Sequence, residues 1–301
     1  MISVPEEKIK AIGGVLNDQT RPLKERFRAL FTLKNIGGKT SIDCINECFS
    51  DPSALLKHEL AYCLGQMQDA HALPILVSVL DNKLQEDIVR HEAAEAIGAI
   101  GTLEDAKLKE LLLKYKDDPV VEVAETCQLA LQRMEWFELH PKERVSPFNS
   151  VDPTPPSTTT DVAQLRQVLL DDNETLFNRY RAMFTLRNIN NEESILALCE
   201  GLNSGGSLFR HEVAFVLGQL AEPRSVPALT EALEDLSQHE MVRHECAEAL
   251  GAVASEDCLG VLRKYLADDK RVVRESCEIA LDMCEYENSP EFQYADTLLK
   301  V

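Results

Sequence analysis

The chain repeats itself on two scales, and this limits it to folds built by stacking similar units. On the larger scale, residues 27–33 return as residues 180–186, and residues 58–66 return as residues 211–219. Both pairs of segments are separated by the same interval, so the 301-residue chain contains two related halves. A duplicated unit of this size indicates a repeat array, because each unit buries its apolar face against its neighbours.

Each half contains a shorter period of about 31–34 residues. In chain order, one helix position is held by Phe27, His58, His91 and Glu125, and then by Tyr180, His211, His244 and Glu275. Apolar residues recur at helical spacing around each of these positions. A second amphipathic stretch, such as residues 72–80, separates successive ones. The sequence therefore predicts an all-α chain of eight helical hairpins, four in each half.

The repeated unit resembles the short HEAT-like repeat, whose second helix carries Val-Arg followed by Ala and Gly at helical spacing. Residues 89–98 and 242–251 match this pattern best. The units around Phe27 and Tyr180 depart from it most, as expected for the first repeat of an array. Small Ala and Gly side chains let stacked helices approach closely. The resemblance implies an α-solenoid.

Residues 137–160 interrupt the period. They contain five prolines followed by residues 157–160, Ser-Thr-Thr-Thr, a composition typical of a flexible or extended linker. We therefore expect a first half of four repeats over residues 1–136 and a second half of four repeats over residues 161–301. The linker is long enough for the halves to continue one solenoid or to face each other.

Composition narrows the function classes. The net charge of −20 argues against nucleic acid and anionic membranes as partners and favours a cationic substrate or a basic protein, although acidity also maintains solubility. No apolar run is long enough to span a membrane, and the N-terminus lacks the pattern of a signal peptide. The nine cysteines show no CxxC spacing, which fits a reducing compartment. We expect a cytoplasmic monomer.

Four of the seven histidines precede a glutamate at equivalent repeat positions. These candidate metal ligands are His58, Glu59, His91, Glu92, His211, Glu212, His244 and Glu245. Imidazole and carboxylate together suit a transition metal. Equal register places the two pairs of each half on one face of helices about 10 Å apart, so their side chains can converge. If the halves face each other, all eight surround a shared metal site. The alternative is a set of polar residues on a solvated face, which four pairs in register disfavour.

A donor set of imidazole and carboxylate without thiolate favours iron or manganese, with zinc also possible. The number of donors favours two ions. Neighbouring helical residues point about 100° apart, so the His and Glu of one pair cannot aim in the same direction. We expect Glu92 and Glu245 to be ligands, while Glu59 and Glu212 either bind a cationic substrate or bridge the ions. A fifth pair, starting at His239, breaks the symmetry and is expected at the surface.

The chain resembles the deoxyhypusine hydroxylase family. The resemblance lies in its HEAT-like repeats, four in each half, and in the His-Glu pairs on the middle two repeats of each half. Residues 55–67 and 241–252 are the most specific segments, and the resemblance covers essentially the whole chain. It implies a di-iron monooxygenase with two Fe(II) ions per chain and dioxygen as co-substrate. Such an enzyme hydroxylates the deoxyhypusine side chain of a translation initiation factor to hypusine. It implies no catalytic residue beyond the metal ligands.

Other functions stay open from the residues alone. A metal-free HEAT-repeat scaffold that binds a basic protein requires none of the four histidines. A HEAT-like lyase acting on tetrapyrroles does not require the repeated His-Glu pairs either. A dinuclear hydrolase would use the same ligand chemistry.

Overall fold

The computed structural model describes residues 4–140 and 146–301, which form helices and connecting loops with no strand among them. The first eight α-helices are α1 (Glu6–Asn17), α2 (Leu23–Ile36), α3 (Gly38–Glu47), α4 (Ala54–Met67), α5 (Leu73–Asp81), α6 (Asp87–Ile100), α7 (Ala106–Tyr115) and α8 (Val121–Leu139). The next eight are α9 (Val162–Leu170), α10 (Leu176–Ile189), α11 (Glu192–Gly201), α12 (Ser207–Leu220), α13 (Val226–Glu234), α14 (Glu240–Val253), α15 (Glu256–Tyr265) and α16 (Arg271–Glu287). Four short 3-10 turns complete the described elements: η1 (Cys48–Ser50), η2 (Ala70–Ala72), η3 (Pro223–Ser225) and η4 (Thr297–Leu299). The predicted all-α solenoid is confirmed, and no described helix has the length and hydropathy to cross a membrane.

The described residues group into two compact units. One unit contains residues 4–140 together with the C-terminal segment 291–301, and the other contains residues 146–290. Helix α8 continues to Leu139, so the first residues of the segment expected as a linker are helical. Residues 141–145 of that segment lie outside the described residues, and residues 146–160 belong to the second unit.

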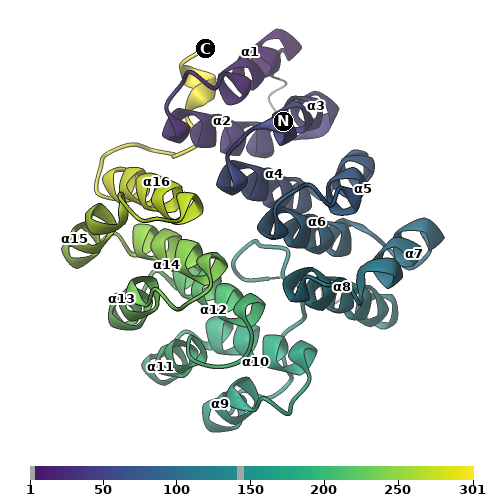
Figure 1. The fold of residues 1–301 in the computed structure, drawn as a ribbon, viewed down its shortest axis with the longest axis vertical. Coiled ribbons are helices and arrows are strands. Elements are labelled where there is room, and N and C mark those ends of the chain that lie inside the picture. Colours follow the sequence, from purple (N-terminus) through teal and green to yellow (C-terminus); the bar gives the residue numbers. More distant parts are fainter. Residues whose placement is uncertain (1–3, 141–145) are drawn as a thin grey trace. The chain divides into compact units, whose positions relative to one another are not determined.

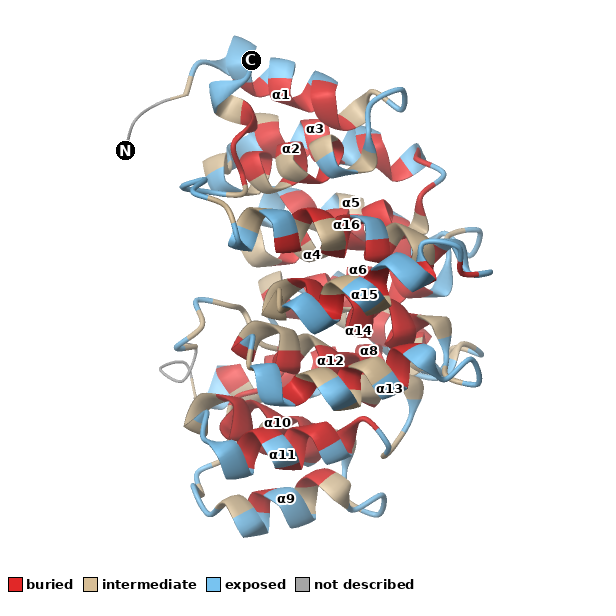
Figure 2. Cartoon of the chain, turned by 90° about the vertical axis from the view of Figure 1, so that its left-hand side faces the viewer, coloured by how far each residue is buried: buried red, intermediate tan, exposed pale blue. Residues whose placement is uncertain are grey.

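Within each unit the helices form two layers (Figure 1). The even-numbered helices pack on one another in chain order, and the odd-numbered helices cover them from one side. The even layer is the more buried one: residues 241–247 of α14 are all buried, whereas α15 buries Cys258, Leu262 and Tyr265. In Figure 2 the buried residues, drawn red, lie mostly on the helices, and many of the loops are exposed and drawn pale blue. The even layer therefore provides the sheltered surface in each unit.

Glycines set the distance between successive even-numbered helices. A Cβ atom added to any of them would lie only 2.7–3.1 Å from the Cα atom of an alanine on the next even-numbered helix. The four contacts are Gly65 with Ala96, Gly98 with Ala130, Gly218 with Ala249, and Gly251 with Ala280. This is the close approach that the small residues of the motif predict. Because the obstacle is backbone, it cannot move aside as a flexible side chain would.

A buried arginine joins each of four repeats to a neighbouring loop. Arg90 shows the pattern: its Nε donates to the carbonyl of Leu80, and its Nη2 donates to Asp118 at 2.8 Å. The same pattern joins Arg26 to Leu16 and Asp51, and Arg243 to Leu233 and Asp268. Arg179 also donates to the carbonyl of Leu169, but its aspartate partner, Asp172, lies in the loop that precedes its own helix. Each arginine thus caps the C-terminal carbonyls of one helix and neutralises a carboxylate of a neighbouring loop. Since each arginine directly precedes the first motif residue, it also fixes the start of the motif helix.

The duplicated helices α2 and α10 each hold an extended segment by the same two residues. On α10, Arg181 donates to the carbonyl of Pro156, and Thr185 Oγ1 accepts from the backbone N–H of Ser157 at 2.6 Å. On α2, the equivalent Arg28 pairs with Glu291 at 2.8 Å and with Asp296 at 3.4 Å. The equivalent Thr32 Oγ1 accepts from the backbone N–H of Thr297 at 3.2 Å. The segments that follow α8 and α16 are therefore held by an arginine and a threonine at equivalent positions of the two halves.

Replacing Gly98 by alanine should destabilise the protein. The new methyl would meet the backbone of Ala130 at 2.9 Å, so α6 and α8 would have to separate, at a cost of about 1–3 kcal/mol. The matched control is Gly260→Ala, where the added Cβ has no atom within 4 Å and should stabilise α15 by about 0.5–1 kcal/mol. Urea unfolding of both variants measures the difference, and equal midpoints would contradict the packing account.

Replacing Asp118 by asparagine should cost about 3–5 kcal/mol at neutral pH, because Arg90 then loses its buried partner. Burial by itself raises the pKa of Asp118, but hydrogen bonds from Arg90 and from the Val120 backbone bring that pKa below its usual value of 3.8. The carboxylate therefore contributes stability above about pH 4 and loses it as the pH falls through the lowered pKa. The variant should lose less stability than the parent between pH 4 and pH 2.

A matched control exists in the second unit. Asp172 pairs with Arg179 at 2.9 Å but its side chain is 71% exposed, so Asp172→Asn should cost under about 1 kcal/mol. Chemical unfolding at several pH values distinguishes the two variants. An equal loss from both would show that burial does not decide the strength of these pairs.

Candidate metal centre

The four His-Glu pairs lie on the middle even-numbered helices of the two units. Helix α4 carries His58 and Glu59, and α6 carries the next pair. Helices α12 and α14 carry the two pairs of the second unit. All eight side chains are buried, with His244 completely so. Such burial is unusual for glutamate and contradicts a solvated helix face, because an ionised carboxylate leaves water only when partners surround it.

In the first unit the pairs of adjacent repeats converge. The rings of His58 and His91 lie 5.5 Å apart between centroids. Glu92 Oε2 lies 3.3 Å from Nε2 of His58 and 4.0 Å from Nε2 of His91. One ligand atom from each of these three residues lies within 4.8 Å of the other two. Glu59 instead faces the opposite ring nitrogen, with Oε1 at 3.7 Å from Nδ1 of His58.

The second unit reproduces this arrangement. The rings of His211 and His244 lie 5.3 Å apart between centroids. Glu245 Oε2 lies 3.3 Å from Nε2 of His211, the same pair of atoms that joins Glu92 to His58 in the first unit. In both units, therefore, the glutamate of the later repeat reaches back to the histidine of the earlier one. The duplication extends to the positions of individual side-chain atoms.

Negative charge dominates the surroundings of His58. Burial by itself lowers the pKa of His58, but its contacts with Glu59 and Glu92 raise that pKa well above the usual value of 6.5. Two carboxylates beside one buried imidazole attract a positive charge to this place. A divalent cation supplies that charge as well as a proton does, and it binds the neutral imidazole.

The donor set fits a transition metal. Each unit brings two imidazoles and a carboxylate together, which is the set used by non-haem iron sites. Nitrogen and oxygen ligands bound to one ion at about 2.0–2.2 Å lie at most about 4.4 Å apart. The ligand atoms of His58, His91 and Glu92 all lie within 4.8 Å of one another, and this bound is close to that limit. Glu92 and Glu245 both lie 3.3 Å from Nε2 of the earlier histidine of their unit, so their position as carboxylate ligands stays our prediction.

The fifth His-Glu pair does not join either cluster. His239 is exposed and caps α14, with its Nδ1 accepting the backbone N–H of Met241 at 3.2 Å. Its predicted surface position is confirmed. The side chain thus caps the N-terminus of α14 and takes no part in the metal cluster.

The sequence interpretation missed a carboxylate next to the second cluster. Glu248 lies four residues after His244 on α14, with Oε1 at 3.5 Å from Nδ1 of the ring. The hydroxyl of Ser276, on α16, donates to the same oxygen at 2.9 Å. The spacing of four residues was visible in the sequence, but the contribution of Ser276 depends on how α14 and α16 pack.

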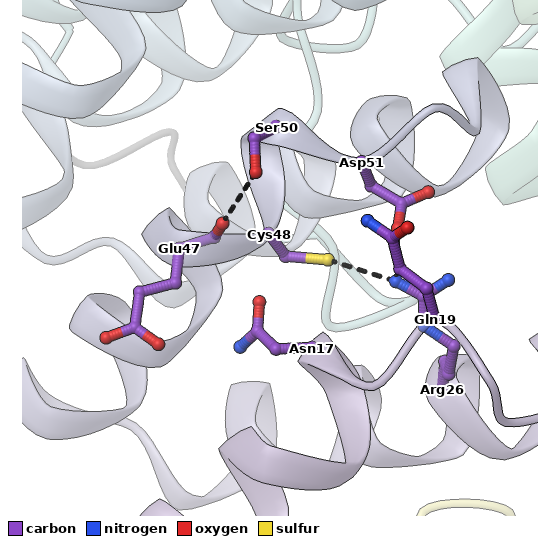
Figure 3. A pocket seen from close by; sticks show the side chains of 7 residues that line it. All are labelled: Asn17, Gln19, Arg26, Glu47, Cys48, Ser50 and Asp51. Carbon is purple, nitrogen blue, oxygen red and sulfur yellow. Dashed lines mark hydrogen bonds and ion pairs between the residues drawn. The ribbon is translucent and has the colours of Figure 1, made fainter.

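A polar pocket of about 280 Å³ lies in the first unit, away from the His-Glu pairs (Figure 3). Its lining includes Arg26, which is already neutralised by Asp51. It also includes Cys48, whose pKa burial raises to about 11 although Arg26 lowers it in part. The thiol is therefore protonated at neutral pH and is a poor nucleophile or ligand. All nine cysteines are free and buried.

Comparison with protein families places the repeat pattern among HEAT repeats. The family model matches four overlapping stretches of the chain: residues 15–98, 45–132, 162–238 and 197–282. These stretches cover most of both units and leave out residues 1–14, 133–161 and 283–301. The number of repeats, eight, stays a prediction.

Comparison with characterised proteins gives full-length relatives. A deoxyhypusine hydroxylase of Drosophila pseudoobscura pseudoobscura is 64% identical over 99% of this chain and 98% of its own length. The human deoxyhypusine hydroxylase is 57% identical over 98% and 97% of the two chains. The solved structure of the human protein, in complex with glycerol, superposes with a TM-score of 0.91 at 56% identity, covering 93% of this chain and 97% of that one.

The two glutamates of one pair should respond differently to substitution. Glu92→Gln should weaken binding of Co(II), a spectroscopic stand-in for a native ion, by about 10-fold or more, because an amide oxygen is a poor ligand. Glu59→Gln should change it by less than about 3-fold. Titration of the metal-free protein, followed by the Co(II) absorption bands, measures both. Equal losses would overturn the distinction between the two carboxylates.

Proposed function

Because the chain belongs to the deoxyhypusine hydroxylase family, we propose that it hydroxylates the deoxyhypusine side chain of a translation initiation factor to form hypusine. The observation that carries the proposal is the pair of buried His-Glu clusters on the middle repeats of each unit. Nothing in the helical packing requires buried histidine and glutamate at these positions. We therefore assign these residues to catalysis and not to helix packing.

The residues fit a di-iron centre. His58, His91 and Glu92 would hold one Fe(II) ion, and His211, His244 and Glu245 would hold the other. When bound, the two ferrous ions supply the electrons with which dioxygen is activated to oxidise a carbon–hydrogen bond. The chain itself provides ligands and orientation and restricts the access of water.

Glu59 and Glu212 are left to orient the substrate. Glu59 is buried and contacts Nδ1 of His58, on the other side of the ring from Glu92. Its carboxylate can accept hydrogen bonds from an ammonium group while remaining beside the cluster. Deoxyhypusine carries two amines that are cationic at neutral pH. We therefore propose that these two carboxylates bind the amines and align the carbon that is hydroxylated.

Burial of the cluster supports the oxidation chemistry in a second way. Side chains that exclude water strengthen the attraction between carboxylate and ammonium. Exclusion of water also protects a reactive oxidant from side reactions. A long, narrow substrate side chain is the kind of group that reaches such a site from a protein surface.

The charge of the whole chain fits a basic partner. Its net charge of −20 steers a cationic protein segment towards the enzyme, with an effect that weakens as salt increases. A metal-free scaffold would use the same charge. It would, however, place its contacts on exposed residues, whereas the eight repeated His and Glu side chains are buried. The buried set therefore favours the enzyme.

The proposal predicts an iron- and oxygen-dependent product. The protein, loaded anaerobically with Fe(II), should add one oxygen atom to a deoxyhypusine-bearing factor when air is admitted, as measured by mass spectrometry of the factor. His91→Ala should lower the rate by at least about 100-fold, with iron content reduced in parallel. The matched control, His71→Ala, removes an exposed imidazole and should leave both unchanged.

A metal-free scaffold protein would give different results in these measurements. Unchanged binding of the factor after all four motif histidines are replaced, with no iron bound by the parent protein, would contradict the proposal. Iron binding and hydroxylation that survive His91→Ala would instead contradict the ligand assignment alone.

A further inference from the structure

The two clusters contain two kinds of histidine, distinguished by the residue one helical turn later. His58 and His211 are followed at that position by Tyr62 and Phe215. His91 and His244 are followed there by Glu95 and Glu248. Residues four apart face each other along a helix, so the later histidine of each unit has a carboxylate available to it. An aromatic ring cannot accept a strong hydrogen bond from imidazole, whereas a carboxylate can.

In the second unit this carboxylate is held in place. Glu248 Oε1 lies 3.5 Å from Nδ1 of His244 and accepts the hydroxyl of Ser276 at 2.9 Å. His244 and Ser276 are both completely buried, and the Glu248 side chain is 16% exposed. The oxygen therefore lies between two fixed groups from adjacent even-numbered helices. Its position is set by the packing of α14 on α16.

We propose that Glu248, held by Ser276, is a positioning residue that orients His244 for metal binding. An imidazole N–H at Nδ1 directed to this carboxylate leaves the lone pair at Nε2 for the metal and fixes the ring plane. It also makes Nε2 a stronger donor, because the carboxylate partly takes the Nδ1 proton. In this role Glu248 acts through His244 and is itself neither a metal ligand nor a substrate contact. The inference rests on the proposed function only in that a metal binds His244.

Comparison with the first unit limits the role of the serine to the second unit. Thr126 stands at the position of Ser276, but its hydroxyl donates to the carbonyl of Glu122 in its own helix at 2.7 Å. The hydroxyl that fixes the carboxylate in the second unit therefore has another partner in the first. The later histidines of the two units are thus supported differently. We expect His244 to be more strictly oriented through Ser276 than His91 is through Thr126.

The test measures metal affinity in the absence of the reaction. The metal-free full chain is titrated with Co(II), and the dissociation constant and absorption bands are compared for Glu248→Ala, Glu248→Gln and Ser276→Ala. We expect about 10–100-fold weaker binding for the alanine variant at Glu248. The glutamine variant retains an acceptor for the Nδ1 proton and should recover most of this loss. Ser276→Ala should weaken binding by a smaller factor, about 3-fold or more.

Two measurements separate positioning from a general loss of structure. Glu234→Ala removes a carboxylate paired with Lys264 on other helices of the same unit and should leave the Co(II) constant unchanged. The thermal midpoint of each metal-free variant reports folding. If Glu248→Ala fails to fold, the comparison of Ser276→Ala with the parent carries the test.

The possible results distinguish the positioning role of Glu248 from the proposed hydroxylase function. Parent-like Co(II) affinity in Glu248→Ala, or no recovery in Glu248→Gln, would overturn the positioning role while leaving the hydroxylase proposal intact. A parent protein that binds neither Co(II) nor Fe(II) would overturn both. A parent that binds metal but does not hydroxylate its substrate would overturn the proposed function alone.

Discussion

The contact between glycine and alanine on successive even-numbered helices is the constraint on which the rest of the structure depends. With backbones this close, short side chains reach across the interface: the histidine rings of adjacent repeats lie 5.5 Å apart in one unit and 5.3 Å in the other. A larger residue at Gly65 or Gly218 would separate the helices and move Glu92 and Glu245 away from the histidines they contact. The motif therefore combines packing and ligand geometry on one helix.

This arrangement costs stability, because carboxylates and imidazoles are taken out of water. The chain compensates with paired groups. Arginines such as Arg90 and Arg243, each one residue before a motif histidine, are themselves buried and neutralised by an aspartate. They fix the first turn of α6 and α14 against the preceding helix. A bound cation would neutralise the remaining carboxylates, so metal binding and folding of each unit should be coupled.

Much of this was predictable from repetition alone. The identity and equal register of the four His-Glu pairs follow from the period, because equivalent positions of stacked repeats share one face. Three features were not predictable. The division between Glu59 and Glu92 depends on side-chain rotamers, since neighbouring helical residues differ in direction but both lie near the cluster. The docking of residues 291–301 on α2 joins parts of the chain that are distant in sequence. The hydrogen bond from Ser276 to Glu248 requires the actual contact of two helices.

The sequence by itself therefore determined the helical class, the duplication and the residue types of the site. Periodicity records which residues must be buried together, and this information is local to each repeat. Only the tertiary structure decided which oxygen faces which nitrogen, which histidine has a supporting carboxylate, and where the terminal segment packs. These depend on distances of a few tenths of an ångström between different helices, and such distances are set by close packing and not by a pattern along the chain.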